Sequence, residues 1–203
     1  MSTERRILVV AHTGRDDSLR TAVEVLDRLT AGGVQAVIVA SDRDDLVSAD
    51  PELASIPVLD QDVPLADIEL TIVLGGDGTI LRAAEIVRGS ASPLMGVNLG
   101  HVGFLAEAER EDLAETVRRA ISGEYEVEER MTIDVSVLVD DVEVYRTWAL
   151  NEATVEKSQP GKMIEVVIEV GGRPLSSFGC DGVVMATPTG STAYAFSAGG
   201  PVV

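Results

Sequence analysis

Five consecutive residues, Gly75-Gly76-Asp77-Gly78-Thr79, combine a permissive backbone with one carboxylate. They follow an apolar run, residues 70–74, and precede a helical pattern over residues 80–87. Glycines let backbone N–H groups approach a phosphate, and the N-terminus of a helix adds partial positive charge. Asp77 would repel a phosphate unless it had a task of its own, such as accepting a proton or organising a metal. The alternative is a plain turn in which Asp-Gly supplies tolerant backbone angles.

Other segments carry polar groups that could recognise a nucleotide. Asn151 and Glu152, which we place at the end of a strand, could read a base edge and a sugar diol, or could be only a polar strand end. Residues 180–201 gather hydroxyls, small residues and a tyrosine, which would let a flat ring approach the backbone; a capped Ser/Thr turn is the alternative. Residues 98–105 are expected to form a glycine-rich loop after a strand. This loop could bind a ligand or could simply connect two elements. Lys162 lies on a turn, where a lysine is commonly only solvated.

Composition limits the classes of partner. The chain has 203 residues, of which 45% are hydrophobic, and a net charge of −18, which argues against a nucleic-acid or anionic membrane surface. Its single cysteine, Cys180, excludes an internal disulfide and fits a reducing cytoplasm. Two histidines, His12 and His101, are too few for a histidine-rich metal site, so we predict no resident metal. No run approaches the ~20 apolar residues of a membrane helix.

Strand and helix patterns alternate in the first half of the chain, which predicts a doubly wound α/β domain with a mostly parallel sheet. Strands are expected over residues 7–11, 34–40, 71–74 and 93–98, and helices over residues 16–31, 80–87 and 109–121. Residues 41–69 read as acidic and irregular, with a short helix. The inward positions of the first helix are predicted to be Leu19, Val23, Leu26 and Thr30, and those of the last to be Leu113, Val117 and Ile121.

In the second half of the chain, one predicted strand follows another. Residues 131–139, 142–150 and 163–170 alternate or run apolar with no long helix between them, which predicts an antiparallel β domain. We therefore divide the chain into an α/β domain over residues 1–124 and an incomplete all-β domain over residues 125–203. The last residues, 197–203, resemble the beginning of another element, so a longer parent protein is expected.

Taken together, the motifs identify a family. The chain resembles the NAD kinases of bacteria, on the glycine turn at 75–79, the loop at 98–105, the pair Asn151-Glu152 and the segment 181–201, and on the order of the domains. The resemblance implies transfer of the terminal phosphoryl group of ATP, or of polyphosphate, to the 2′-hydroxyl of the adenosine ribose of NAD. It also implies Mg²⁺ or another divalent cation bound with ATP, and a homodimer or homotetramer.

On the phosphate side, the resemblance implies that Asp77 accepts the proton of the ribose 2′-hydroxyl. Arg82, one helical turn further, would offer positive charge near the phosphates. The remaining residues of the turn would line the nucleotide site: Gly75, Gly76, Gly78 and Thr79.

On the dinucleotide side, the resemblance implies that Asn151 contacts the adenine and Glu152 the ribose hydroxyls. Phe104 would lie against the dinucleotide, and Asp181 would face the nicotinamide amide across a subunit interface. Lys162 matches a position that is often basic in the family. The adenine pocket would be shaped by a further set of small and hydroxyl-bearing residues: Thr189, Thr192, Ala193, Tyr194 and Ser197.

Two other functions remain open from the sequence. A lipid or sugar kinase could share the glycine turn, because diacylglycerol-type kinases and phosphofructokinases carry similar turns, although residues 181–201 argue against it. A module that senses NAD or NADP without catalysis is the non-enzymatic alternative. Asp77 argues against the sensor, because a pure binder needs no base there.

Overall fold

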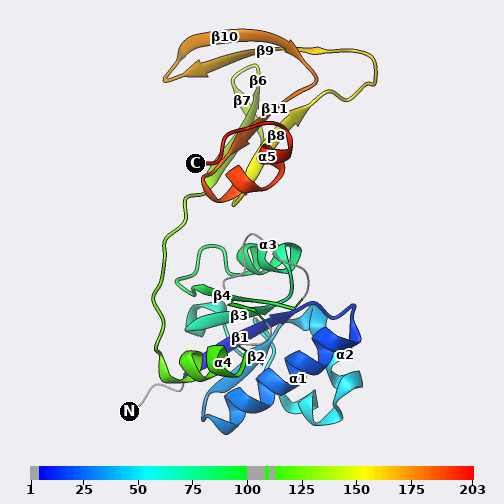
Figure 1. The fold of residues 1–203 in the computed structure, drawn as a ribbon, viewed down its shortest axis with the longest axis vertical. Coiled ribbons are helices and arrows are strands. Elements are labelled where there is room, and N and C mark those ends of the chain that lie inside the picture. The colour runs from blue at the N-terminus through cyan, green and yellow to red at the C-terminus, as the bar shows by residue number, and fades with distance from the viewer. Residues whose placement is uncertain (1–4, 100–107, 110–112) are drawn as a thin grey trace. The chain divides into compact units, whose positions relative to one another are not determined.

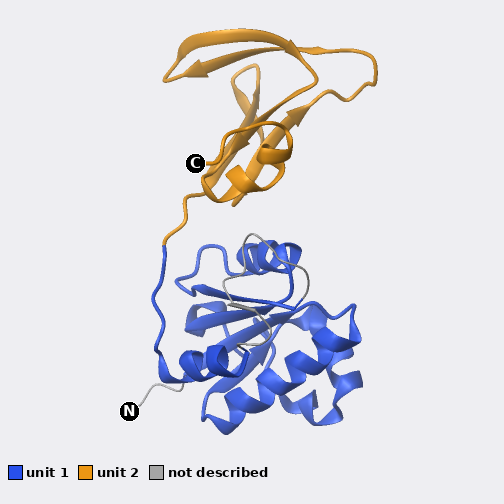
Figure 2. Cartoon of the chain, in the orientation of Figure 1, with its two compact units in different colours: residues 1–128 blue, residues 129–203 orange. Residues whose placement is uncertain are grey.

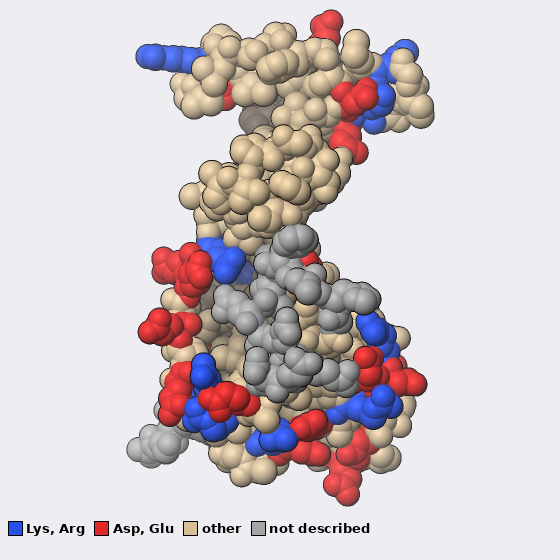
Figure 3. Space-filling model, in the orientation of Figure 1, with Lys and Arg blue, Asp and Glu red and all other residues tan. Residues whose placement is uncertain are grey.

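The computed structural model describes residues 5–99, 108–109 and 113–203. The chain forms two compact units, residues 1–128 and 129–203 (Figure 2). Among the described residues, no helix has both the length and the apolar character needed to cross a bilayer. On the face of unit 1 shown in Figure 3, basic side chains are interspersed with acidic ones and form no single basic patch.

Unit 1 is built on a five-stranded sheet in the order β2-β1-β3-β4-β5, in which every neighbouring pair is parallel (Figure 1). The strands are β1 (Arg6–Ala11), β2 (Gln35–Ile38), β3 (Leu70–Leu74), β4 (Leu94–Asn98) and β5 (Ala108–Glu109). The helices are α1 (Asp16–Ala31), α2 (Arg43–Ala49), α3 (Asp77–Ile86) and α4 (Leu113–Ser122). Short 3-10 turns lie between β2 and β3: η1 (Ala40–Asp42), η2 (Pro51–Ser55) and η3 (Leu65–Asp67).

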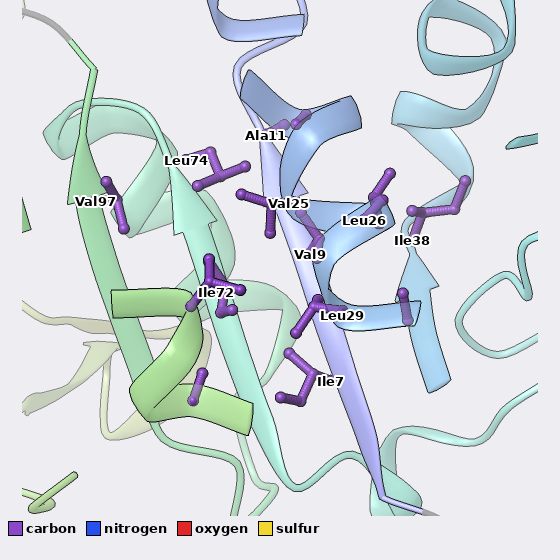
Figure 4. Close-up of a cluster of buried hydrophobic side chains, with 14 of the residues drawn as sticks. Ile7, Val9, Ala11, Val25, Leu26, Leu29, Ile38, Ile72, Leu74 and Val97 are labelled. Atoms are coloured by element: carbon purple, nitrogen blue, oxygen red, sulfur yellow. The ribbon is translucent and has the colours of Figure 1, made fainter. Parts of the chain in front are cut away.

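Alternation along the strands divides the apolar side chains between two faces. Ile7 and Val9 pack under α1 and α4, whereas Leu8 and Val10 pack under α3, because successive side chains of a strand point to opposite faces. Figure 4 shows the first cluster, in which Val25, Leu26 and Leu29 of α1 lie over β1 and β3. Both faces of the sheet are covered, which confirms the predicted doubly wound α/β fold.

The buried face of α1 differs from the predicted one. Thr30 is exposed and its hydroxyl donates to the Leu26 carbonyl at 2.9 Å, while Leu19 and Val23 are only partly buried. The buried side chains include small and polar ones: Ser18, Thr21, Ala22, Val25, Leu26 and Leu29. A face centred on Ala22 and Val25 lets the helix approach the sheet closely, and a search for large apolar residues alone misses it.

Several predicted boundaries in unit 1 also differ. The helix expected over residues 80–87 spans Asp77–Ile86. The strand expected over residues 34–40 ends at Ile38, because the chain turns into η1 at Ala40. The last helix, expected from residue 109, begins at Leu113, and Glu109 instead pairs with Asn98 at the edge of the sheet.

Unit 2 consists of three antiparallel ladders, β6-β7, β8-β11 and β9-β10, followed by η5 (Thr189–Thr192) and α5 (Tyr194–Ser197). The strands are β6 (Ile133–Val139), β7 (Val142–Ala149), β8 (Glu152–Glu156), β9 (Ile164–Val170), β10 (Arg173–Cys180) and β11 (Gly182–Ala186). The antiparallel β character is as predicted. Asn151-Glu152 does not end a strand, however, because β7 ends at Ala149 and Glu152 begins β8.

One ion pair joins three parts of unit 1. The Arg5 Nε donates to Glu69 Oε2 at 2.8 Å and its Nη2 donates to Glu69 Oε1 at 2.5 Å. The same guanidinium donates to the carbonyls of Ala120, at 3.0 Å, and Ile121 in the last turn of α4. A cation on the final carbonyls of a helix is favourable, so Arg5 ties the beginnings of β1 and β3 to the end of α4.

This pair gives a pH-dependent prediction. The hydrogen bonds from Arg5 hold the pKa of Glu69 below its ordinary value of 4.5. A carboxyl with a lowered folded-state pKa stabilises the protein above its unfolded pKa, and the contribution is lost as pH falls through the folded pKa. Because the pair is about one-third exposed, we expect Glu69→Gln to cost about 1 kcal/mol or less at neutral pH. Thermal unfolding should show the gap to wild type closing below pH 4.5; a gap independent of pH would contradict the assignment.

Candidate active site

The glycine turn joins the carboxyl end of β3 to α3. Gly76 is the N-cap of α3 and Asp77, half-buried, is its first residue. The Gly75 N–H donates to the Val97 carbonyl at 3.1 Å, which holds the turn against β4. A Cβ at Gly75 would collide with the buried Thr79 side chain. Glycine is therefore required there because Thr79 folds back over the turn.

An open cleft of about 390 Å³ lies at this edge of the sheet. One wall is the loop after β1, residues 11–14, and the other comprises Gly76, Gly78, Thr79 and Arg82. The volume is in the range of small-molecule sites, and ligands of open α/β sheets bind at the carboxyl ends of the strands. A Cβ at Gly76 or Gly78 would meet nothing within 4 Å, so both backbones face open space.

Arg82 lines the cleft but is not a free cation. Its Nη1 and Nη2 donate to the two oxygens of Asp42 at 2.8 and 2.9 Å, and Nη2 also donates to the Ala11 carbonyl at 2.7 Å. Asp42 is 1% exposed. The positive charge expected from Arg82 near phosphates is thus compensated inside the protein. Sequence reasoning missed both Asp42 and the loop after β1; only the position of that loop, directly after a buried strand, could have indicated it.

In unit 2, Thr187 holds the Asn151-Glu152 pair against the segment that follows β11. Glu152 pairs with Ala186 across β8 and β11, which brings the two segments side by side. The Thr187 N–H donates to the Asn151 carbonyl at 2.8 Å, and its buried hydroxyl donates to the Leu150 carbonyl at 2.6 Å. The same hydroxyl accepts from the Gly190 N–H at 3.0 Å. Segments 36 and 37 residues apart in the sequence are thereby held together.

Two oxygen atoms in this arrangement lack partners. Asn151 Oδ1 and Glu152 Oε2 are buried and have no hydrogen-bond partner among the described residues. Burial also raises the pKa of Glu152 above its ordinary value. Buried polar atoms are normally hydrogen-bonded, so these two acceptors on consecutive residues are candidates for contact with a ligand that brings N–H or O–H groups.

The other residues predicted to bind the dinucleotide do not all lie beside Asn151 and Glu152. The hydroxyl-rich set lies on η5 and α5 and the residue between them: Thr189, Thr192, Ala193, Tyr194 and Ser197. Asp181 is 74% exposed in its side chain and pairs with Lys157 Nζ at 2.6 Å. Lys162 is exposed on the turn before β9. Phe104 lies outside the described residues.

Comparisons with known proteins find matches for both units of the chain. A family model described as the ATP-NAD kinase N-terminal domain matches residues 7–125, and one described as the ATP-NAD kinase C-terminal domain matches residues 150–203. The chain belongs to the NAD kinase family. The glycine turn lies in the first match, and the Asn151-Glu152 pair lies in the second.

Curated relatives carry the same family name. An NAD kinase of Leifsonia xyli subsp. xyli is 63% identical over 203 residues, covering 100% of this chain and 67% of that protein. One from Thermobifida fusca is 54% identical over 207 residues, covering 100% of this chain and 64% of that protein. The chain therefore spans about two thirds of the length of these relatives.

Two solved structures are similar to the chain. A yeast NADH kinase complexed with NADH matches with a TM-score of 0.83 and 24% identity, over 100% of this chain and 63% of that one, and this likeness shows the fold. An NAD kinase from Archaeoglobus fulgidus in complex with ATP matches with a TM-score of 0.66 and 31% identity, over 98% of this chain and 67% of that one. The fold of a parallel α/β unit followed by antiparallel β-ladders is therefore that of the NAD kinase family.

The contact between Gly190 and Asn151 gives a second prediction. A Cβ at Gly190 would collide with the backbone carbonyl of Asn151, and backbone cannot rotate away as a side chain can. We expect Gly190→Ala to destabilise unit 2 by about 2 kcal/mol or more, measured by denaturant unfolding. Gly179→Ala is the control, because a Cβ there would make only an ordinary contact of 3.6 Å with Met163. Equal stability of the two variants would contradict the close approach.

Proposed function

We propose that the chain carries the catalytic and binding residues of an NAD kinase, which transfers the terminal phosphoryl group of ATP to the 2′-hydroxyl of the adenosine ribose of NAD. The observation that carries the proposal is the position of Asp77 at the first residue of α3, in a glycine turn beside an open cleft. Membership of the family and the relatives named NAD kinases support it.

The proposed chemistry needs one base and a phosphate seat. Asp77 takes the proton of the ribose 2′-hydroxyl as that oxygen forms its bond to the γ-phosphorus, and the bond from this phosphorus to the β–γ bridging oxygen breaks. Phosphoryl transfer otherwise depends on positioning and on electrostatic stabilisation. The N-terminus of α3 and the exposed backbone at Gly76 and Gly78 supply both. Because these groups contact only phosphates, polyphosphate fits the same seat as an alternative donor.

Recognition of NAD is assigned to unit 2. The buried acceptors Asn151 Oδ1 and Glu152 Oε2 are suited to the amino group of adenine and the hydroxyls of its ribose. The turn containing Thr189, Thr192, Ala193, Tyr194 and Ser197 shapes the adenine pocket. Asp181 faces the nicotinamide amide, with Phe104 and Lys162 as further contacts. These roles rest on the family resemblance together with the position of Glu152 beside Ala186.

A divalent cation fits this donor site as a companion of ATP. The described residues contain no group of three or more His, Cys, Asp or Glu side chains that could hold a metal. Mg²⁺ commonly keeps several waters and binds through substrate phosphates with few protein ligands, so the phosphates of ATP would hold it here. When bound, the cation neutralises phosphate charge. The resemblance further supports a homodimer or homotetramer. The single cysteine supports a cytoplasmic location, and the net charge of −18 argues against nucleic acid or an anionic membrane as a partner.

The proposal is tested by NADP formation from NAD, ATP and Mg²⁺, read with an NADP-specific dehydrogenase. We expect Asp77→Asn to lower the rate by about 10²- to 10⁴-fold, because general-base catalysis is lost. Asp16→Asn is a matched control, since Asp16 is also the first residue of a helix that follows a strand, and should keep the rate.

The assay should use this chain and a version lengthened past Val203. Absence of NADP from both wild-type lengths would contradict the activity. Full turnover in Asp77→Asn would contradict the role of Asp77 while leaving the activity standing.

A further inference from the structure

Asp42 is a buried carboxylate at the centre of a hydrogen-bond network beside the cleft. It ends η1, after β2, and is 1% exposed. Its Oδ1 accepts from Arg82 Nη1 at 2.8 Å and from the Ser41 hydroxyl at 3.0 Å, and its Oδ2 accepts from Arg82 Nη2 at 2.9 Å and from the Ala11 N–H at 3.1 Å. A carboxylate with this many donors is fully used by the protein and does not itself contact a ligand.

The network closes a ring between the two walls of the cleft. The Ala11 N–H donates to Asp42, Asp42 accepts from Arg82, and Arg82 Nη2 donates back to the Ala11 carbonyl at 2.7 Å. Ala11 ends β1 and leads into the cleft-lining loop, while Arg82 lies on α3, one turn after Gly78. Asp42 therefore adds a buried side-chain link between the end of β1 and α3 to the backbone pairing of β1 with β3.

Arg82 is oriented by this ring. An arginine has five N–H donors in a planar fork, and the Nη donors of Arg82 go to Asp42, Ser41 and Ala11. Stability alone is a weak reason for such a pair, because a buried ion pair is often no better than apolar packing of equal volume. A stronger reason for the pair is that it fixes the positions of the guanidinium and of the loop after β1. In a reaction that depends on positioning, misplacement of about 1 Å can lower the rate ~100-fold.

We propose that Asp42 is a positioning residue for the donor phosphates, acting through Arg82 and Ala11 on the two walls of the cleft. This inference rests on the proposed function, because it takes the cleft as the seat of the ATP phosphates. Arg82 then forms part of the wall of the cleft, with its charge balanced by Asp42. The backbone of the glycine turn is the main contact of the phosphates.

The test compares Asp42→Asn, Arg82→Lys and the double variant. Asp42→Asn removes the charge and one acceptor, and Arg82→Lys keeps the charge but loses the fork. We expect each single variant to raise the KM for ATP about tenfold or more with the KM for NAD unchanged, because only the donor wall is displaced. The KM for ATP of the double variant should be no higher than that of the more affected single variant, since both changes open the same ring.

Glu69→Gln is the matched control. It breaks another bidentate pair between a carboxylate and an arginine, at the amino end of β3 and away from the cleft, so it should leave the KM for ATP unchanged. Additive effects in the double variant, an equal rise in both KM values, or tighter ATP binding in Asp42→Asn would overturn the proposal. If Asp42→Asn does not fold, Arg82→Lys alone with an unchanged KM for ATP overturns it.

Direct binding of tripolyphosphate by calorimetry separates this inference from the proposed function. Wild-type binding that Asp42→Asn weakens about tenfold, in a protein that makes no NADP, would keep the positioning role and reject the kinase activity. NADP formation with equal tripolyphosphate affinity in wild type and Asp42→Asn would keep the activity and reject the positioning role.

Discussion

Parallel pairing of β1, β3 and β4 is the constraint on which the candidate site of unit 1 depends. In a parallel sheet the carboxyl ends of neighbouring strands lie at one edge, so the loop after Ala11 and the turn after Leu74 must lie next to each other. Hydrogen bonds from His12 to the Leu74 carbonyl, at 2.9 Å, and from Gly75 to the Val97 carbonyl, at 3.1 Å, extend this pairing past the strand ends. The glycine turn is thereby fixed by the backbone of the sheet itself.

In unit 2 the feature that bears on function is a pair of buried side-chain acceptors. Its ladders bury two acceptors, at Asn151 and Glu152, for which the described part of the chain supplies no donor, and the raised pKa of Glu152 follows from that burial. Such an arrangement is unfavourable in the free protein and is relieved when a ligand brings hydroxyl or amino groups. The backbone around the pair is meanwhile secured by Thr187 and by the close approach of Gly190. Hydrogen bonds and close backbone contact thus hold the chain around these two atoms, which suits their proposed role in recognising a hydrogen-bonding ligand.

Sequence patterns predicted the features that depend on local chemistry. The run at residues 70–74 and the glycines after it indicate β3 and the turn into α3, because apolar strands and glycine turns have their own signatures, although the helix was expected from residue 80 and begins at Asp77. Strand β8 could not be located in this way, since it is held by pairing with β11, some thirty residues later. The link between Asp42 and Arg82 was equally hidden, because their sequence separation is 40 and no local pattern pairs them before the sheet brings them together.

The central claim is that unit 2 recognises NAD whereas Asp77 serves the chemical step. Titration calorimetry of NAD into Glu152→Gln and Asp77→Asn tests it most directly. The account predicts that NAD affinity falls about tenfold or more in Glu152→Gln, because a hydrogen-bonded charged group is lost, and stays at the wild-type value in Asp77→Asn. Unchanged affinity in Glu152→Gln together with a loss in Asp77→Asn would contradict it.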